Sequence, residues 1–325
     1  MERIAILTSG GDSPGMNACI KAVVNSCSSH NIICIGINNG YQGLIDNDMM
    51  FLNNDIVENI DFLGGSFLKV ARSAEFATPE GLEKAVRNLN KNKIEGLIVI
   101  GGNGSFKGAE ALVDAGVKVV GIPGTIDNDL FYTDKTLGFD TAVNNAVMAV
   151  DNIRQSIASN NRGFVVETMG RNCGDIALHT AVATCAHSVA IKELDITIKD
   201  IVRDVTACMK AGVESPIVVI SENVDYSVAD VEKALQNNLG IETRGTALGY
   251  IVRGGAPSVG DRVLAIQWGI TAVELLLNGK SNIALGVDDD KVIMVTLHEA
   301  NTAKQVLDLQ NYYNLRTLHN LPIKK

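Results

Sequence analysis

The hydrophobic positions of the chain form short β-branched runs that alternate with longer amphipathic stretches. The runs predict strands at Arg3–Thr8, Ile32–Ile37, Gly96–Ile100, Val117–Ile122, Gly163–Thr168, Pro216–Ser221 and Val292–Thr296. The amphipathic stretches predict helices that include Asn17–Ser28, Thr141–Ile157, Ile176–Thr184 and Ile198–Lys210. This alternation is typical of α/β layers built on mostly parallel sheets. The length of 325 residues favours two such domains.

Glycines and polar residues gather directly after five of these predicted strands. The segments are TSGGDSPGMN at residues 8–17, GGNGS at 101–105, PGTIDND at 123–129, ETMGR at 167–171 and SEN at 221–223. Parallel α/β sheets bind their ligands at the edge where the carboxyl ends of the strands meet, so these segments predict one composite site. We expect that site to lie in a cleft between two domains. The acidic segment GVDDDK at 286–291 is interpreted as a solvated turn.

Composition and charge narrow the class of protein. The net charge of −9 argues against a basic surface for nucleic acid, and no apolar run approaches the length of a membrane span. The first residues, MERIAILTSGG, enter a predicted strand at once and do not match a secretory signal. The six cysteines form no C-x-x-C pair, and the five histidines lack the spacing of metal ligands. We therefore expect a cytoplasmic protein with reduced thiols, and neither nucleic acid nor membrane as its partner.

The glycine-rich segments predict a site for phosphate. A strand that ends in glycines before a helix offers free backbone N–H groups to an anion. The chain lacks the G-x-x-x-x-G-K-[ST] loop, and Gly102, Gly104 and Gly108 miss the dinucleotide spacing by one residue. No acidic residue occurs at the offset that a dinucleotide site needs, so a nicotinamide dehydrogenase is poorly supported. The alternative for each segment is a tight turn without a ligand.

The segment PGTIDND carries a more specific signal. Asp127 and Asp129 place two carboxylates one residue apart after a buried strand, where unpaired carboxylates are costly. One of them could accept a proton from a substrate hydroxyl, while the other orients a metal-bound phosphate. Guanidinium groups suit phosphate oxygens, and arginines accumulate near the same segments: Arg72, Arg154, Arg162, Arg171, Arg244 and Arg253. The alternative is a turn rich in Asp and Asn.

With these residues assembled, the chain resembles the bacterial-type ATP-dependent 6-phosphofructokinases. The shared motifs follow the family's order along nearly the whole chain: TSGGDSPGMNA, GYQGL, GGNGS, PGTIDND, MGRNCGD, SEN and ETRGTALGYIVRGG. The resemblance implies two Rossmann-like three-layer α/β domains with the active-site cleft between them. Residues 1–138 with about 252–302 would bind ATP, and residues 139–251 with about 303–325 the sugar phosphate. The implied assembly is a homotetramer with active sites shared between subunits.

The resemblance also implies a reaction and assigns roles to residues. The γ-phosphoryl group of ATP, with Mg²⁺ as cofactor, would pass to the 1-hydroxyl of fructose 6-phosphate, a step of glycolysis. Asp127 would be the general base beside Thr125, and Asp129 would arrange the metal indirectly. The charge of the transferring group would be stabilised by Arg171, Arg72 and the N–H of Gly11. ATP would be lined by Gly11, Arg72, Gly102, Asn103, Gly104, Ser105 and Gly108. The sugar phosphate would be held by Thr125, Asp127, Met169, Gly170, Arg171, Glu222 and Arg253, with Arg162 and Arg244 from a neighbouring subunit.

The chain departs from the family's pattern at several positions. Asn103 stands where the family has the aspartate that contacts Mg²⁺. Its amide oxygen can still coordinate the metal, so we expect weakened metal handling and reduced, but not abolished, activity. Tyr250 stands in place of a histidine, which predicts weaker binding of the 6-phosphate. At the family's effector site Lys21 and Arg154 keep their charge, whereas basic residues are replaced at Asn25, Asn54, Ala211 and Val213, and a glutamate at His187. A site with so few cations predicts little allosteric regulation.

The resemblance also bears on the phosphoryl donor and on the choice between an enzyme and a regulator. Pyrophosphate-dependent relatives place an acidic residue at the position of Gly104 and a lysine at that of Gly124, so the two glycines favour ATP. The alternative to an active kinase is a weakly catalytic paralogue with a regulatory or assembly role. Against it stand the intact Asp127, Asp129, Arg171, Arg72 and Glu222.

Overall fold

The computed structural model describes residues 1–304 and 306–323, and the chain forms two compact units. The first unit consists of Met1–Thr141 and the segment that starts at Gly254, and the second consists of Ala142–Arg253 and the segment that starts at Val306. Both units combine parallel strands with helices, so the predicted α/β fold in two domains is confirmed. Within the described residues, no helix is both long and apolar enough to cross a membrane.

The first unit is built on a 7-stranded sheet with the order β11-β10-β5-β4-β1-β2-β3. The strands are β1 (Arg3–Thr8), β2 (Ile33–Ile37), β3 (Met49–Leu52), β4 (Gly96–Gly101), β5 (Val119–Pro123), β10 (Ile283–Asp288) and β11 (Lys291–Thr296). The five central strands pair in parallel, and only the edge strands β3 and β11 run antiparallel to their neighbours. The central strands are continuously apolar because both faces of the sheet are covered.

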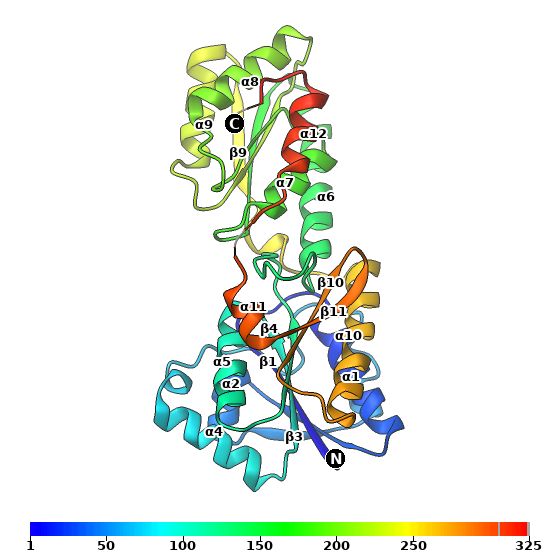
Figure 1. The fold of residues 1–325 in the computed structure, drawn as a ribbon. Helices are drawn as coiled ribbons and strands as arrows, with labels where there is room; N and C mark the ends of the chain where they lie inside the picture. The colour runs from blue at the N-terminus through cyan, green and yellow to red at the C-terminus, as the bar shows by residue number, and fades with distance from the viewer. Residues whose placement is uncertain (305, 324–325) are drawn as a thin grey trace. The chain divides into compact units, whose positions relative to one another are not determined.

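Helices cover the two faces of this sheet, as Figure 1 shows. One face carries α1 (Met16–Ser29) and α10 (Val259–Leu277), beside the short α3 (Asn54–Val57). The other face carries α2 (Gly40–Asp46), α4 (Pro79–Lys91), α5 (Asn103–Asp114) and α11 (Leu297–Thr302), with the 3₁₀ turn η1 (Glu75–Ala77). Side chains alternate between the faces with a period of two, so Ile98 and Ile100 of β4 point toward α1 and α10, whereas Leu97 and Val99 point the other way.

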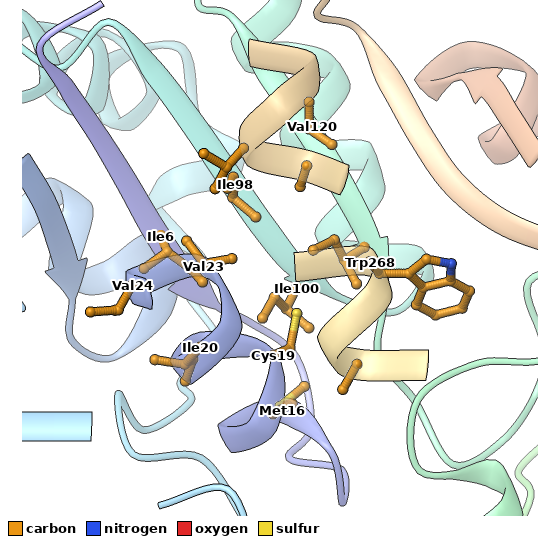
Figure 2. Packing of buried hydrophobic residues seen from close by; sticks show 14 of the residues in the cluster. Ile6, Met16, Cys19, Ile20, Val23, Val24, Ile98, Ile100, Val120 and Trp268 are labelled. Carbon is orange, nitrogen blue, oxygen red and sulfur yellow. The ribbon is translucent and has the colours of Figure 1, made fainter. Parts of the chain in front are cut away.

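The packing between α1 and α10 is close and almost wholly apolar (Figure 2). Met16, Cys19 and Val23 of α1 lie over β1 and β4, and Trp268 of α10 is fully buried in the same cluster. Gly269 allows the two helix backbones to approach, because a Cβ atom there would lie 2.8 Å from Ala22 Cβ. Burying large side chains such as Trp268 contributes roughly 2–3 kcal/mol each to folding.

The second unit is built on a smaller, all-parallel sheet with the order β7-β8-β6-β9. Its strands are β6 (Gly163–Thr168), β7 (Ser188–Ala190), β8 (Ile217–Ser221) and β9 (Thr243–Ala247). Figure 1 shows α8 (Ile198–Lys210) and α9 (Val228–Leu239) on one side of the sheet, and α7 (Asp175–Ala183) and α12 (Gln310–Leu318) on the other. The unit also contains most of α6 (Phe139–Ala158) and the 3₁₀ turn η2 (Gly249–Ile251). Both α8 and α9 begin with a capping box, formed by Thr197 with Asp200 and by Ser227 with Asp230.

The acidic segment at 286–291 is not a solvated turn over its whole length, so that interpretation was wrong. Gly286–Asp288 belong to β10 and Lys291 begins β11, and the two strands form an antiparallel hairpin. Only Asp289 and Asp290 form the turn, with φ of 49° and 58°. A two-residue turn with both residues at positive φ matches the twist of a hairpin, and Asp tolerates that conformation.

A buried carboxylate, Asp261, fixes the start of α6 to the first turn of α10. Asp261 Oδ1 accepts a hydrogen bond from the Gly138 N–H (2.9 Å), and Oδ2 accepts from the N–H (2.8 Å) and the hydroxyl of Thr141. The Thr141 hydroxyl in turn accepts from the Ser258 N–H, at 2.9 Å. Asp261 is only 2% exposed, and burial raises the pKa of its carboxyl group. The Asp261 side chain thus accepts three hydrogen bonds from residues at the end of the segment Met1–Thr141.

Asp261→Asn should lower the free energy of unfolding by about 1–3 kcal/mol. The three donors bind two carboxylate oxygens in the parent protein, whereas the amide offers only one acceptor oxygen. Its NH₂ group would face a backbone N–H, which is then left unsatisfied. Urea unfolding followed by circular dichroism measures the change. The exposed Asp151→Asn on α6 serves as the control and should stay within about 0.5 kcal/mol. An equal, small effect of both variants would contradict the role given to Asp261.

The C-terminal helix α12 is held to the second unit by a buried ion pair. The guanidinium group of Arg316 forms a two-pronged ion pair with the Asp204 carboxylate of α8, and both side chains are at most 3% exposed. Nearby, the rings of His187 and His319 lie 5.1 Å apart, and His187 Nδ1 accepts a hydrogen bond from the Ile217 N–H at 2.9 Å. Burial, His319 and the Arg154 guanidinium lower the pKa of His187 to about 4.

This histidine should make the protein less stable in acid. The unfolded chain binds a proton at His187 below about pH 6.5 and the folded chain only near pH 4, so stability falls as the pH drops between these values. His187→Asn keeps an acceptor for the Ile217 N–H but cannot be protonated, so its unfolding midpoint should fall less over this range. Midpoints measured at several pH values, with the exposed His30→Asn as control, test this. Parallel curves for all three proteins would refute it.

Candidate active site

Three of the predicted binding segments come together at the carboxyl ends of β5, β4 and β1, which are neighbours in the sheet. The hydrogen-bond pattern continues past the strands, because the Ser9 N–H donates to Ile100 O (2.9 Å) and the Gly124 N–H to Gly101 O (3.0 Å). A Cβ atom on Gly102 would lie 3.4 Å from Thr125 Cβ. The segments at 8–17, 101–105 and 123–129 therefore form one surface of the first unit, on which Gly11 is half-buried.

The helix α5 begins on this surface. Gly102 is its N-cap, with extended backbone and no side chain to cap the helix, so the first N–H groups of the helix face outward from the sheet edge. Gly104 has no atom within 4 Å of the place where a Cβ would lie. The protein itself does not need a glycine there, and the open space suits a ligand. Free N–H groups beside open space are the features of an anion site.

The other small residues of α5 are explained differently. Gly108 supports packing, because a Cβ atom would lie 2.7 Å from the ring of Tyr41, which stacks on Phe76 at 4.1 Å. The Tyr41 hydroxyl donates to Ser105 O at 2.5 Å, whereas the buried Ser105 hydroxyl has no partner within the protein. Packing against Tyr41 therefore explains why a glycine stands at position 108, independently of its predicted contact with the nucleotide.

Asn103, the first residue of α5, is bound to the segment that follows β5. Its Nδ2 atom lies 2.8 Å from Asp129 Oδ2 and 3.1 Å from the backbone oxygen of Asp129. Two oxygen atoms on the same side fix the orientation of the amide, since only its NH₂ group can donate to both. The amide therefore helps to hold the Asp129 carboxylate in place.

Thr125 and Asp127 lie on the same segment. The Asp127 N–H donates to Thr125 Oγ1 at 3.2 Å, and the Thr136 hydroxyl donates to Thr125 O at 2.6 Å. Asn128 between the carboxylates has φ of 50°, a turn conformation that Asn tolerates. Asp127 is only 6% exposed, so its carboxylate sits in a site largely shielded from water.

The loop that leads to Arg72 is fixed by a residue that the sequence analysis did not single out, Asn17. Its buried side chain donates to Leu63 O (3.0 Å) and Gly64 O (3.2 Å) and accepts from the Phe67 N–H (2.6 Å). The Thr8 hydroxyl holds the next part of the loop by donating to Lys69 O at 2.8 Å. Asn17 stands inside the motif TSGGDSPGMN, and a polar residue on the apolar face of a predicted helix was the available signal.

In the second unit, Met169, Gly170 and Arg171 form a turn after β6, and Glu222 follows the neighbouring strand β8. Glu222 Oε1 accepts hydrogen bonds from the N–H groups of Gly170 (3.0 Å) and Arg171 (2.6 Å). The structure thus brings three predicted sugar-phosphate residues together. It also shows Glu222 binding protein backbone, a role that was not predicted. Burial and the Glu222 charge raise the pKa of the nearby Glu167.

Arg162 and Arg244 lie at the opposite end of the same sheet. Arg162 directly precedes β6 and Arg244 is the second residue of β9, and both pair with Glu242, at 2.9 Å and 2.8 Å. The length of β6, roughly 17 Å, separates them from the turn at Arg171. Within one chain these two arginines therefore do not join the Arg171 group.

Arg253 lies near Tyr250, the residue that departs from the family's pattern. Its guanidinium carbon is 5.6 Å from the centre of the Tyr250 ring, which is 77% exposed. This is the geometry of a cation–π contact. The face of the tyrosine ring thus contacts Arg253, a residue predicted to bind the sugar phosphate.

The predicted effector residues are engaged within their own units. Lys21 Nζ pairs with Asp61 Oδ1 at 2.7 Å and donates to Glu58 O, and this lysine lowers the pKa of the Asp61 carboxyl group. Arg154 donates to Thr184 O. These contacts use part of the donor capacity of each cation, since a lysine carries three N–H donors and an arginine five.

The donor set of the first unit fits a metal ion that arrives with a phosphate ligand. Across residues 1–304 and 306–323, no group of three or more His, Cys, Asp or Glu side chains is arranged to hold a metal by itself. Mg²⁺ in phosphoryl-transfer sites is bound by one or two carboxylates together with substrate phosphates and water. Asp129, with Asp127 beside it, supplies that kind of partial site.

Comparisons with known proteins find similar sequences along nearly the whole chain. The family described as Phosphofructokinase matches residues 3–276. The chain is 46% identical over 312 residues to the ATP-dependent 6-phosphofructokinase of Clostridioides difficile, covering 96% of this chain and 98% of that one. It is 43% identical over 318 residues to the enzyme of the same name from Brevibacillus brevis, covering 98% and 99%.

Solved structures show the same fold. Phosphofructokinase from Saccharomyces cerevisiae superposes with a TM-score of 0.87 at 31% identity, covering 93% of this chain and 45% of that one. A pyrophosphate-dependent phosphofructokinase from Marinobacter aquaeolei superposes with a TM-score of 0.85 at 20% identity, covering 100% and 93%, which shows the fold alone. Family match, identity and fold together lead to one conclusion: the chain belongs to the phosphofructokinase family.

Proposed function

We propose that the protein is an ATP-dependent 6-phosphofructokinase of glycolysis. It transfers the γ-phosphoryl group of ATP to the 1-hydroxyl of fructose 6-phosphate, giving ADP and fructose 1,6-bisphosphate. The observation that carries this proposal is that the shielded Asp127 lies on the segment that packs, through Thr125 and Asp129, against the glycine-rich start of α5. The names of the full-length relatives support the same substrates.

The chemistry assigns separate tasks to the residues of the first unit. Asp127 accepts the proton of the 1-hydroxyl as its oxygen attacks the γ-phosphorus and the bond to the β–γ bridging oxygen breaks. Thr125 is beside it, and the N–H of Gly11 and the guanidinium of Arg72 offset charge on the phosphoryl group. The N–H groups of Gly102, Asn103 and Gly104 bind the nucleotide, and Gly104 leaves space for it.

The residues of the second unit bind the acceptor. Met169, Gly170, Glu222 and Arg253 hold the sugar phosphate, and Arg171 stabilises the charge of the transferring group. Arg162 and Arg244 reach the 6-phosphate from a neighbouring subunit of a homotetramer. Their separation from Arg171 along β6 supports this arrangement, since they are at the wrong end of the sheet for the site of their own chain. We place the enzyme in the cytoplasm. We expect little effector control, because Asn25, Asn54, Ala211 and Val213 stand where the family has basic residues.

Mg²⁺ bound to ATP supplies charge neutralisation at the phosphates, and Asp129 is the carboxylate that would hold it. Asn103 contributes by fixing Asp129 rather than by adding a charge. A weakly catalytic paralogue with a regulatory role is less well supported. Such a protein would not need a shielded base, and the full-length relatives carry the name of the enzyme.

Asp127→Asn should lower kcat by about 10²–10⁴-fold, because the amide cannot accept the proton of the hydroxyl. ADP release in a coupled assay, with and without fructose 6-phosphate, measures the rate. Asp114→Asn at the exposed end of α5 is the control and should keep full activity. If the parent protein releases no ADP in response to fructose 6-phosphate, the proposed function is wrong. If Asp127→Asn is fully active, the base is another residue.

Asn103→Asp should couple the stability of the free protein to Mg²⁺. It replaces the hydrogen bond to Asp129 by two carboxylates at about 3 Å, a like-charge contact that costs roughly 1 kcal/mol in a partly exposed site. The thermal midpoint should fall by about 2–4 °C in EDTA and recover in Mg²⁺, while the parent protein should not respond. The variant should also need less Mg²⁺ for half-maximal activity. Equal midpoints with and without Mg²⁺, or no gain in Mg²⁺ affinity, would show that Asn103 does not control this carboxylate.

A further inference from the structure

The turn after β6 holds one of its residues, Arg171, in an unfavourable backbone conformation. Arg171 has φ of 53°, the left-handed region that costs a side-chain-bearing residue about 1 kcal/mol or more. Gly170 before it has φ of 143°, and its N–H group is bound by Glu222. A strained conformation at a site residue persists only where neighbouring groups hold it.

Both backbone polar groups of Arg171 are held by two consecutive residues. Glu222 Oε1 accepts from the Arg171 N–H at 2.6 Å, and Asn223 Nδ2 donates to Arg171 O at 3.0 Å. Asn223 is itself left-handed, with φ of 65°, and asparagine tolerates this region better than most residues. Glu222 and Asn223 follow β8, which is hydrogen-bonded to β6. The pairing of the two strands therefore sets the distance between these two residues and the turn at Arg171.

The far end of the same turn is held from the strand on the other side of β8. Lys192 Nζ donates to Asn172 Oδ1 at 2.8 Å, and Glu193 Oε1 accepts from the Gly174 N–H at 2.8 Å. Both residues follow β7. The turn is thus held at its far end from β7 and at Arg171 from β8, and Asn223 supplies the contact to the Arg171 carbonyl group.

We propose that Asn223 is a positioning residue for catalysis, which acts through the backbone of Arg171. Its amide holds the carbonyl group of Arg171, so the guanidinium group starts from a fixed main chain and reaches the transferring phosphoryl group in one geometry. This inference rests on the proposed role of Arg171 in stabilising that group. Preorganised charges contribute to catalysis because they need no rearrangement during the reaction.

Asn223→Gly is the variant that isolates the amide. Glycine adopts the left-handed conformation without steric cost, so only the hydrogen-bond donor is lost. We expect kcat to fall about 3- to 10-fold, the effect of one hydrogen bond, with the KM for ATP unchanged. The thermal midpoint should fall by no more than about 2–4 °C, which leaves the enzyme folded at the assay temperature. Asn223→Asp, which keeps the size but carries no donor, should lose at least as much. Asn31→Gly, at a left-handed asparagine in the loop between α1 and β2, is the matched control and should behave as the parent.

The route through Arg171 is tested with a double-mutant cycle. Arg171→Ala should lower kcat strongly, and adding Asn223→Gly to it should cause no further loss. If Arg171→Ala keeps the parent's kcat, the proposed role of Arg171 is wrong and the inference falls with it. Two outcomes would leave the proposed function intact but overturn the positioning role of Asn223. In the first, Arg171→Ala is impaired and Asn223→Gly is not. In the second, Asn223→Gly lowers kcat by the same factor with and without Arg171→Ala. A fall in the thermal midpoint that accounts for the lost activity would likewise overturn it.

Discussion

The parallel hydrogen-bond ladder that joins β5, β4 and β1 is the interaction on which the candidate site depends. It runs in register from Ile4 and Gly96 to Thr8 and Ile100, and from Leu97 and Val119 to Gly101 and Pro123. Because the ladder continues into Ser9 and Gly124, the turns after the three strands start level with one another. Short side chains in these turns then allow them to pack together, with Gly102 beside Thr125 and Asn103 beside Asp129. A slip of one residue in either pairing would separate these contacts and turn the apolar faces of the strands around.

In each unit, several polar side chains near the strand ends bind backbone groups of the neighbouring loops. Asn17 fixes the loop before Arg72, Thr8 holds the next part of that loop, and Glu222 with Asn223 fixes the turn at Arg171. Each replaces a main-chain partner that the irregular loop cannot find in the sheet. Arg72 and Arg171, which would meet a phosphate, stand on these loops, so hydrogen bonds to the loops restrict where their side chains start. Phosphoryl transfer relies on positioned charge, and such support is therefore part of the chemistry.

Two buried carboxylates anchor the segments of the chain that return from far along the sequence. Asp261 binds the start of α6 through Gly138 and Thr141 without a cation, whereas Asp204 binds α12 through the guanidinium of Arg316. Removing one partner of either group would leave a buried charge or donor unsatisfied, which costs more than the interaction contributes when intact. These contacts specify where α6 and α12 attach, a task that apolar packing alone leaves less defined.

The sequence by itself determined the kinds of element, the two-domain α/β class and the family. Periodicity located β1 and β6 at their observed bounds, since continuous apolar runs between glycine-rich turns leave few alternatives. It also placed Asp127, Asp129, Gly102 and Asn103 at strand ends. Only the tertiary structure decided that Asn103 donates to Asp129, that Gly108 serves the packing of Tyr41, and that Glu222 binds the Arg171 backbone. The hairpin at Gly286–Lys291 and the anchors Asn17 and Asp261 were likewise decided there. The physical reason is that each of these roles is a contact between residues far apart in the chain, and its partner is set by strand order and register, which local patterns of polarity do not contain.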